Sequence, residues 1–146
     1  MEKQESDYTM IDWWKKVVFK NYANFSGRAR RAEFWFYSLA NVLVIIPFYI
    51  LGMIGISTEQ SVFTSLGFAV YGLVALGTLV PSLAVTVRRL HDVNRSGWFY
   101  FIGLIPLIGG IILLVWFFTD GDRYTNNYGD DPKNMQELAF DFEQTT

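Results

Sequence analysis

Three long apolar runs, separated by short polar segments, constrain the fold of this chain more than any other feature. They cover residues 34–56, 62–87 and 98–119, and none of them contains a charged residue. About 20 apolar residues in a helix cross a hydrocarbon core of about 30 Å. Runs of 23, 26 and 22 residues therefore predict an all-α membrane protein with three transmembrane helices.

Composition and aromatic residues support this prediction. Only 18% of the 146 residues are charged, against about 25% in typical soluble domains. Aromatic clusters occupy 34–37, 98–101 and 116–118, at the expected ends of the first and third helices. Aromatic rings that carry a polar edge favour the level of the lipid headgroups. A soluble globular class is therefore excluded.

The segment before the first run has the pattern of an amphipathic helix. Thr9 and Asp12 are placed as a capping box, with Asp in the position of the usual Glu. Behind them, aromatic and aliphatic residues recur at helical spacing, and lysines lie on the other side: Ile11, Trp14, Val18, Tyr22 and Phe25, against Lys15, Lys16 and Lys20. This pattern predicts a helix in the membrane interface, or one packed against the membrane domain.

The chain thus divides into three parts. Residues 1–33 form a polar N-terminus with the interfacial helix, 34–119 the transmembrane domain, and 120–146 a polar, acidic tail. The tail ends in a short candidate amphipathic segment around Leu138, Phe140 and Phe142.

The distribution of basic residues predicts the orientation. Between Trp13 and Arg31 there are six basic residues and no acidic one, and the polar loop 88–97 adds three arginines. The turn 57–61 has none and the tail has two. Basic residues accumulate on the cytoplasmic side. We therefore expect a cytoplasmic N-terminus and, with three spans, a tail on the opposite face.

Each apolar run contains one internal proline, which leaves one helical carbonyl without its N–H donor. Pro47, Pro81 and Pro106 deprive the carbonyls of residues 43, 77 and 102. An unsatisfied carbonyl is costly in lipid, so we expect a hydroxyl or a neighbouring helix to supply a donor.

A charged cluster borders the apolar runs and is the candidate functional site. Its members are Arg28, Arg31, Glu33, Arg88, Arg89, His91 and Asp92. One interpretation is a structural clamp in which Glu33 and Asp92 neutralise arginines from the other segment. The alternative is an anionic lipid site, because the arginines outnumber the carboxylates and arginine binds phosphate bidentately.

Little in the chain indicates catalysis. The chain lacks cysteine, and His91 is its single histidine. His91 and Asp92 are half of a catalytic dyad without a recognisable nucleophile, and they are too few ligands for a metal site. We therefore expect no enzyme activity, metal or cofactor, and no nucleic-acid partner.

Five segments, taken in order, resemble a known family. They are FSGRARRAEFW at 25–35, PSLAVTVRRLHD at 81–92, SGW at 96–98, IPLIG at 105–109 and NNYGDDP at 126–132. In type and order they are similar to the domain-of-unknown-function 805 family, the YhaH-like bacterial inner-membrane proteins, over about residues 11–133. The resemblance implies the bacterial plasma membrane and no established activity.

The sequence thus favours a binding or scaffold protein of the plasma membrane, with lipids, further copies of itself or another membrane protein as partners. One alternative is an oligomeric channel or transporter component, since small and hydroxylic residues form a stripe along 62–87. The other is a membrane enzyme that uses His91 and Asp92.

Overall fold

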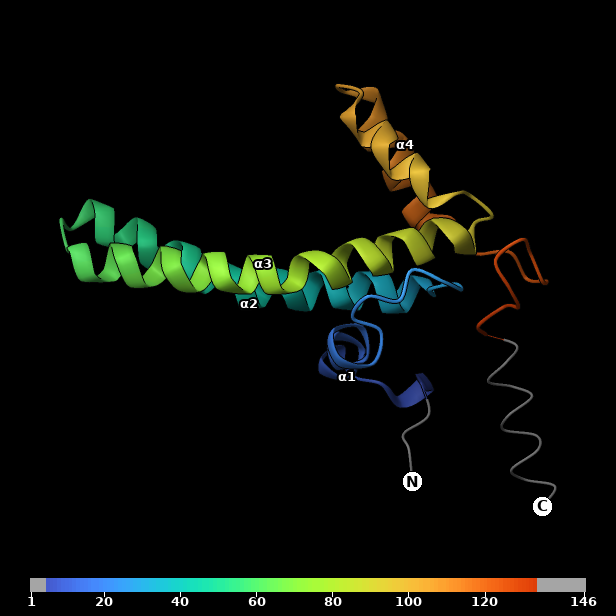
Figure 1. The fold of residues 1–146 in the computed structure, drawn as a ribbon, viewed down its shortest axis with the longest axis horizontal. Helices are drawn as coiled ribbons and strands as arrows, with labels where there is room; N and C mark the ends of the chain where they lie inside the picture. The colour runs from blue at the N-terminus through green and yellow to red at the C-terminus, as the bar shows by residue number, and fades with distance from the viewer. Residues whose placement is uncertain (1–4, 134–146) are drawn as a thin grey trace, which may run out of the picture.

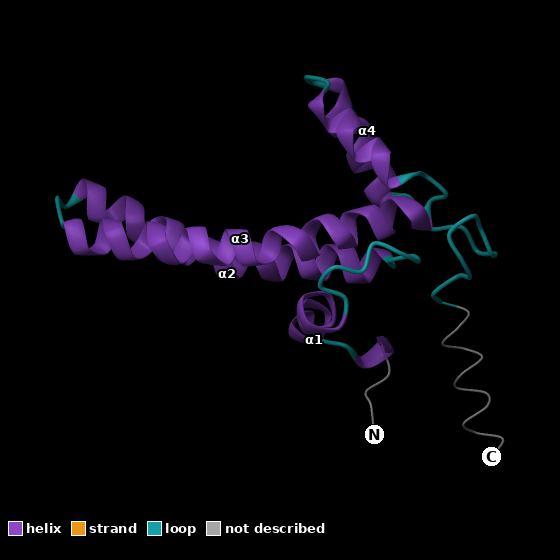
Figure 2. Ribbon diagram, viewed as in Figure 1, coloured by secondary structure: helices purple, strands orange, loops and turns teal. Residues whose placement is uncertain are grey.

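The computed structural model describes residues 5–133. Figure 2 shows that every regular element in this range is helical, as expected from the apolar runs. In chain order, the elements are the 3-10 turn η1 (Glu5–Asp7), α1 (Met10–Lys15), the π-helical η2 (Lys16–Lys20), α2 (Arg31–Ser57), α3 (Ser61–Asp92), the 3-10 helix η3 (Gly97–Leu104) and α4 (Ile108–Phe118).

Helices α2 and α3 form a long antiparallel pair that runs the length of the molecule (Figure 1). Small residues bring the two backbones together near the turn that joins them. A Cβ on Gly67 would collide with the backbone of Gly52, and a Cβ on Gly55 would collide with Thr64. Such close contact, through dispersion, is how helices associate where no water drives them together.

Two helices are long and apolar enough to cross a membrane by length and composition, namely α2 and α3. Only 17% and 22% of their most apolar windows are buried inside the structure. The core helix of a soluble protein would be mostly buried. The apolar side chains of this pair instead face outward, where acyl chains rather than water would cover them.

The helix of the second apolar run extends beyond the C-terminal end of that run. Helix α3 does not end near residue 87 but continues through Arg88 and Arg89 to Asp92. Helix α2 likewise begins at Arg31, before the apolar run. Arg88 pairs with Glu33 across the two helices, and Arg89 pairs with Asp92 within α3.

The third apolar run is not a single helix, so the prediction of three transmembrane helices is not confirmed. It divides into η3 and α4, and Pro106 lies in the turn between them and not inside a helix. Leu107 takes a left-handed φ of 66°, and a Cβ on Gly109 would collide with the Ile102 carbonyl. The chain therefore reverses at 105–107, and we call η3 and α4 the apolar hairpin.

The reversal also determines where the tail lies relative to α3. Because the apolar hairpin returns to its starting point, the chain after Thr119 lies beside the end of α3 and not on the opposite face (Figure 1). The Asp122 amide donates to the Asp92 carbonyl at 3.0 Å. The Asn126 side chain donates to the His91 carbonyl at 2.9 Å. Residues 134–146, with the candidate amphipathic segment, lie outside the described part of the chain.

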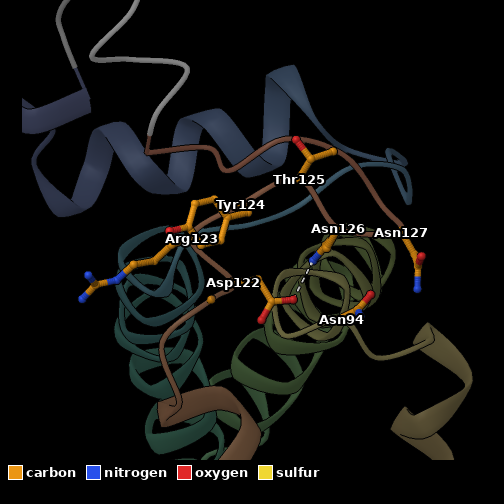
Figure 3. A pocket seen from close by; sticks show the side chains of 8 residues that line it. Asn94, Asp122, Arg123, Tyr124, Thr125, Asn126 and Asn127 are labelled. Atoms are coloured by element: carbon orange, nitrogen blue, oxygen red, sulfur yellow. Dashed lines mark hydrogen bonds between the residues drawn. The ribbon is translucent and has the colours of Figure 1, made fainter.

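Helix α1 runs across the α2–α3 pair, nearly end-on in Figure 1 and lengthwise in Figure 3. The predicted capping box is present, with Thr9 and Asp12 bonded in both directions. Trp13 and Val17 are buried against the pair, whereas Ile11 and Phe19 are exposed. An apolar outer face on a helix that crosses the bundle axis suits the membrane interface.

One of the three carbonyls released by proline has the expected partner. The Tyr22 hydroxyl donates to the Gly77 carbonyl at 2.9 Å, four residues before Pro81. The Ile102 carbonyl instead accepts from the Ile105 amide within the turn of the apolar hairpin. The segment after η2 is thus tied to the backbone defect that Pro81 creates in α3.

Candidate functional site

The charged side chains of the described residues gather in one half of the molecule, where α2 begins and α3 ends. Helix α1, the loop 21–30, the ends of α2 and α3, and the tail all contribute to this half (Figure 1). The opposite turn, between α2 and α3, carries only Glu59. We call the first half the charged end.

Glu33 lies at the centre of the first ion-pair network. It is 1% exposed and accepts from Arg88 and from Lys16, the latter at 2.8 Å. Lys16 also contacts Glu5 at 2.6 Å, and Glu5 accepts from Arg30 at 3.1 Å. This chain of alternating charges ties α1 and α2 to α3. Removing any inner member would leave a buried charge uncompensated.

Trp13 supports the same network. Lys16 and Arg30 lie over its ring, 5.1 and 6.0 Å from the centroid. A cation over an indole face is attracted by the ring quadrupole. The buried tryptophan of α1 thus helps to hold two of the cations that the carboxylates neutralise.

Asp92 organises a second network, which we call the Asp92 clamp, formed by Arg28, Arg89 and Asp92. The Arg28 Nε donates to one carboxylate oxygen at 2.9 Å, and Arg89 donates to the other. All three residues are buried. One carboxylate cannot neutralise two guanidinium groups, so the remaining donors require other acceptors.

Backbone carbonyls of the tail supply the acceptors for Arg28. Its guanidinium donates to the carbonyl of Tyr124 at 2.9 Å, to that of Gly129 at 3.3 Å, and to that of Asp122. Gly121 fits closely in this contact, because a Cβ there would collide with the Asp92 carboxylate. The hydrogen bonds of Arg28 therefore hold residues 122–129 of the tail around its guanidinium group.

Arg89 performs the equivalent role at the end of α4. Its guanidinium donates to the carbonyls of Trp116, Phe117 and Thr119, where the helix leaves carbonyls without intrahelical donors. A cation at a helix C-terminus also complements the helix dipole. Trp35 adds a bond from its Nε1 to the Phe117 carbonyl at 3.2 Å. The base of the apolar hairpin is thus fixed at the charged end.

Arg31 and His91 lie at the surface of the cluster. Arg31 contacts Asp120 at 3.0 Å, with both side chains substantially exposed. The hydrogen bond from Arg31 and its positive charge lower the pKa of Asp120 below the ordinary aspartate value. The His91 ring stacks on Tyr128, with centroids 3.8 Å apart and an angle of 4° between the rings. Its Nδ1 lies 3.1 Å from the Gly27 carbonyl.

An open polar pocket of about 760 Å³ lies over the tail (Figure 3). It is lined by Asn94, Gly121, Asp122, Arg123, Tyr124, Thr125, Asn126 and Asn127. Asn126 spans its floor, with its amide 3.4 Å from the Asp122 carboxylate. Amide and hydroxyl groups can bond a polar molecule here. Within residues 5–133, no group of three or more His, Asp or Glu side chains could hold a metal ion.

The seven residues expected in the site do gather at the charged end. Five of them are buried and paired, which corresponds to the clamp interpretation: Arg28, Glu33, Arg88, Arg89 and Asp92. The anionic lipid site stays a prediction. The dyad of the enzyme alternative is not assembled, since Asp92 binds arginines and His91 faces Tyr128 and Gly27.

Sequence reasoning missed the partners that balance the arginines. Glu5 and Asp120 each pair with an arginine of the cluster region. Carbonyls of the tail accept from Arg28, and carbonyls at the end of α4 accept from Arg89. Backbone acceptors leave no signature in a sequence. The resemblance of the segment 126–132 to a family motif, as strong as that of the arginine segments, was the available indication that the tail joins the site.

Known proteins resemble this chain over most of its length. The family described as "Protein of unknown function (DUF805)" matches residues 22–130. Inner membrane protein YhaI of Escherichia coli (strain K12) is 40% identical over 120 residues, which are 82% of this chain and 95% of that protein. Inner membrane protein YhaH of the same strain is 36% identical, over 84% and 98%. No solved structure matches. The chain therefore belongs to the DUF805 family of bacterial inner membrane proteins.

Proposed function

We propose that this protein is a non-enzymatic scaffold of the bacterial inner membrane whose charged end faces the cytoplasm and retains anionic phospholipid. The observation that carries the proposal is the segregation of charge. Every lysine and arginine within residues 5–133 lies in the half of the molecule where α2 begins and α3 ends. Basic residues mark the cytoplasmic side of bacterial membrane proteins.

In this arrangement both the start of α2 and the tail face the cytoplasm. The difference in basic residues between the two membrane faces is then larger than it was for three spans. The two basic residues of the described tail, Arg123 and Lys133, lie on the same face as the other basic residues. The opposite turn contributes Glu59 alone. Two spans with both ends on one face also agree with the two helices that are long enough to cross.

The exposed cations, rather than the buried ones, are the lipid contacts in this proposal. Arg28 and Arg89 are occupied by the Asp92 carboxylate and by backbone carbonyls, and Arg88 pairs with the Glu33 carboxylate. Lys15 and Arg95 are exposed, and Arg95 lies over the Trp116 ring at 5.4 Å, at the base of the apolar hairpin. Each juxtamembrane cation gains about 1 kcal/mol from an anionic leaflet.

Native mass spectrometry of the protein, released from membranes that contain phosphatidylglycerol and phosphatidylethanolamine, tests the lipid contact. We expect preferential retention of phosphatidylglycerol, and loss of that preference when Lys15 and Arg95 are both replaced by glutamine. Glu59→Gln, at the opposite end, is the matched control and should leave the preference unchanged. Equal retention of both lipids by the unmodified protein would refute the lipid contact.

Labelling of single cysteines tests the orientation, and the absence of native cysteine makes the experiment clean. A cysteine at Ser61 should react with an impermeant thiol reagent added to intact spheroplasts. A cysteine at Asn94 should react only after lysis. The reverse pattern would place the charged end outside and remove the basis for contact with the cytoplasmic leaflet.

The channel alternative receives less support than the scaffold. Its basis was the polar stripe of the second run, and this stripe packs within the α2–α3 pair. The Tyr37 hydroxyl of α2 contacts Ser82 at 2.7 Å and donates to the Thr78 carbonyl at 3.3 Å. Polar groups that hydrogen-bond to one another between two helices stabilise the helix pair.

A further inference from the structure

The apolar hairpin and α1 both lie beside the α2–α3 pair toward the charged end, on opposite sides of the pair in Figure 1, and no part of the proposed function explains them. The hairpin carries no charge between Gly97 and Phe118. Its side chains are among the most exposed apolar groups of the structure. Trp98 is 80% exposed and Leu107, at the tip, is 89% exposed. Such a surface requires an apolar covering.

The length of the hairpin restricts what can cover it. Helix α4 has 11 residues, so it is about 16 Å long at 1.5 Å per residue. The hydrocarbon core is about 30 Å thick. The base is fixed at the charged end by Arg89 and Trp35, and the tip points back toward the far end while leaning away from α3 (Figure 1). The hairpin can thus enter one leaflet but cannot reach the other face.

The interfacial helix adds to the same leaflet. Phe19 of η2 is 73% exposed, and the bond from Tyr22 to the Gly77 carbonyl sets the depth of the following segment. Gly77 lies 11 residues before Arg88 in α3, about 16 Å deeper along the helix. This depth is about half of the hydrocarbon core of about 30 Å, so the chain around Tyr22 lies beside α3 within the leaflet at the charged end.

We propose that the apolar hairpin and α1 together form a single-leaflet wedge, whose partner is the acyl chains of the leaflet at the charged end. The far leaflet contains only α2 and α3 of the described elements. The near leaflet contains these two, the hairpin and α1. A protein wider in one leaflet favours a membrane in which that leaflet is stretched, as shallow amphipathic insertions do.

The proposal accepts the two-span arrangement of the proposed function but does not depend on anionic lipid. Its tests therefore use vesicles of phosphatidylcholine alone, where no preference for anionic lipid can contribute. Failure of the wedge would leave the retention of phosphatidylglycerol untouched, and the reverse also holds.

The first test is sidedness. Tyr124 is 82% exposed, and only its backbone carbonyl contacts Arg28, so a cysteine there preserves the Asp92 clamp. In sealed vesicles of a variant that carries both Tyr124→Cys and Ser61→Cys, each molecule should react with an impermeant dye at one of the two cysteines and not at both. A cysteine at Leu107 should react from neither side. If Tyr124→Cys and Ser61→Cys react in the same molecules, 97–118 crosses the bilayer and the proposal is wrong.

The second test is curvature. Reconstitution yields both orientations, and the impermeant dye selects one of them in each variant. Tyr124→Cys labels the molecules with the charged end outside, and Ser61→Cys labels the others. In tubes pulled from giant vesicles, the outer leaflet is stretched. We expect enrichment of labelled Tyr124→Cys on the tube relative to the vesicle, and depletion of labelled Ser61→Cys. Equal tube-to-vesicle ratios for the two orientations would overturn the wedge.

Discussion

Replacing Glu33 by glutamine tests whether the ion-pair network at the charged end holds the helices together. Glu33 accepts from Arg88 and Lys16, and its side chain is 2% exposed. Glutamine has nearly the same shape but no charge. The variant therefore removes the countercharge of Arg88 without opening a cavity.

The magnitude follows from burial. The Arg88 side chain is 4% exposed, so water cannot replace the lost carboxylate. Leaving a buried charge unpaired costs about 3–5 kcal/mol. Asp120→Asn provides the matched control, because the same change of charge then affects an exposed pair. The side chains of Arg31 and Asp120 are 41% and 66% exposed, so water solvates both charges and the pair contributes little to stability.

Reversible unfolding in mixed micelles, followed by circular dichroism, measures both variants. We expect Glu33→Gln to lose about 3 kcal/mol or more of its free energy of unfolding, and Asp120→Asn to lose far less, because water solvates the exposed pair. Adding Arg88→Gln to Glu33→Gln should recover part of the loss, since the unpaired charge disappears. Similar small losses for Glu33→Gln and Asp120→Asn would show that the buried network does not stabilise the fold.

Two further substitutions examine the tail and the interfacial helix. Gly121→Ala places a methyl group against the Asp92 carboxylate and should destabilise the tail by about 1–3 kcal/mol, measured as faster proteolysis after residue 119. Gly110→Ala is the control, because the space at its Cβ is open, and it should have no effect. An equal effect of the two substitutions would contradict the close fit of Gly121. Tyr22→Phe removes the donor to the Gly77 carbonyl and should lower stability by about 0.6–2 kcal/mol; an unchanged free energy of unfolding would mean that lipid or water replaces it.

The sequence predicted the helical fold and the gathering of the site for reasons that are local or short in range. Apolar runs force α2 and α3, because a backbone in lipid must satisfy its own hydrogen bonds. Arg28 precedes the first apolar run and Asp92 follows the second. Because the two helices are antiparallel, both residues lie at the same end of the helix pair. The Thr9 cap is also local, since it needs only residues three positions apart.

The missed features depend on contacts between distant segments. The count of apolar residues in 98–119 is the same whether the chain crosses or turns back. Pro106 and Gly109 allow a turn, but both also occur inside membrane helices. What decides the outcome is the set of buried donors on Arg28 and Arg89, which bind carbonyls of the tail and of the end of α4 once the chain has turned back. The excess of arginines over carboxylates can be read from the sequence. The backbone carbonyls that accept hydrogen bonds from the surplus arginine donors cannot.

The Asp92 clamp has a consequence for the order in which the protein matures. The carbonyls that Arg28 binds belong to residues 94 to 101 positions later in the chain. The ribosome therefore delivers Arg28, α2 and α3 to the membrane well before their acceptors exist. Until residue 129 has emerged, a guanidinium destined for burial must remain hydrated, and the end of α3 cannot close around it. A chain cut short before the tail thus carries an exposed, unfinished cluster, by which a membrane protease could distinguish it from the finished protein.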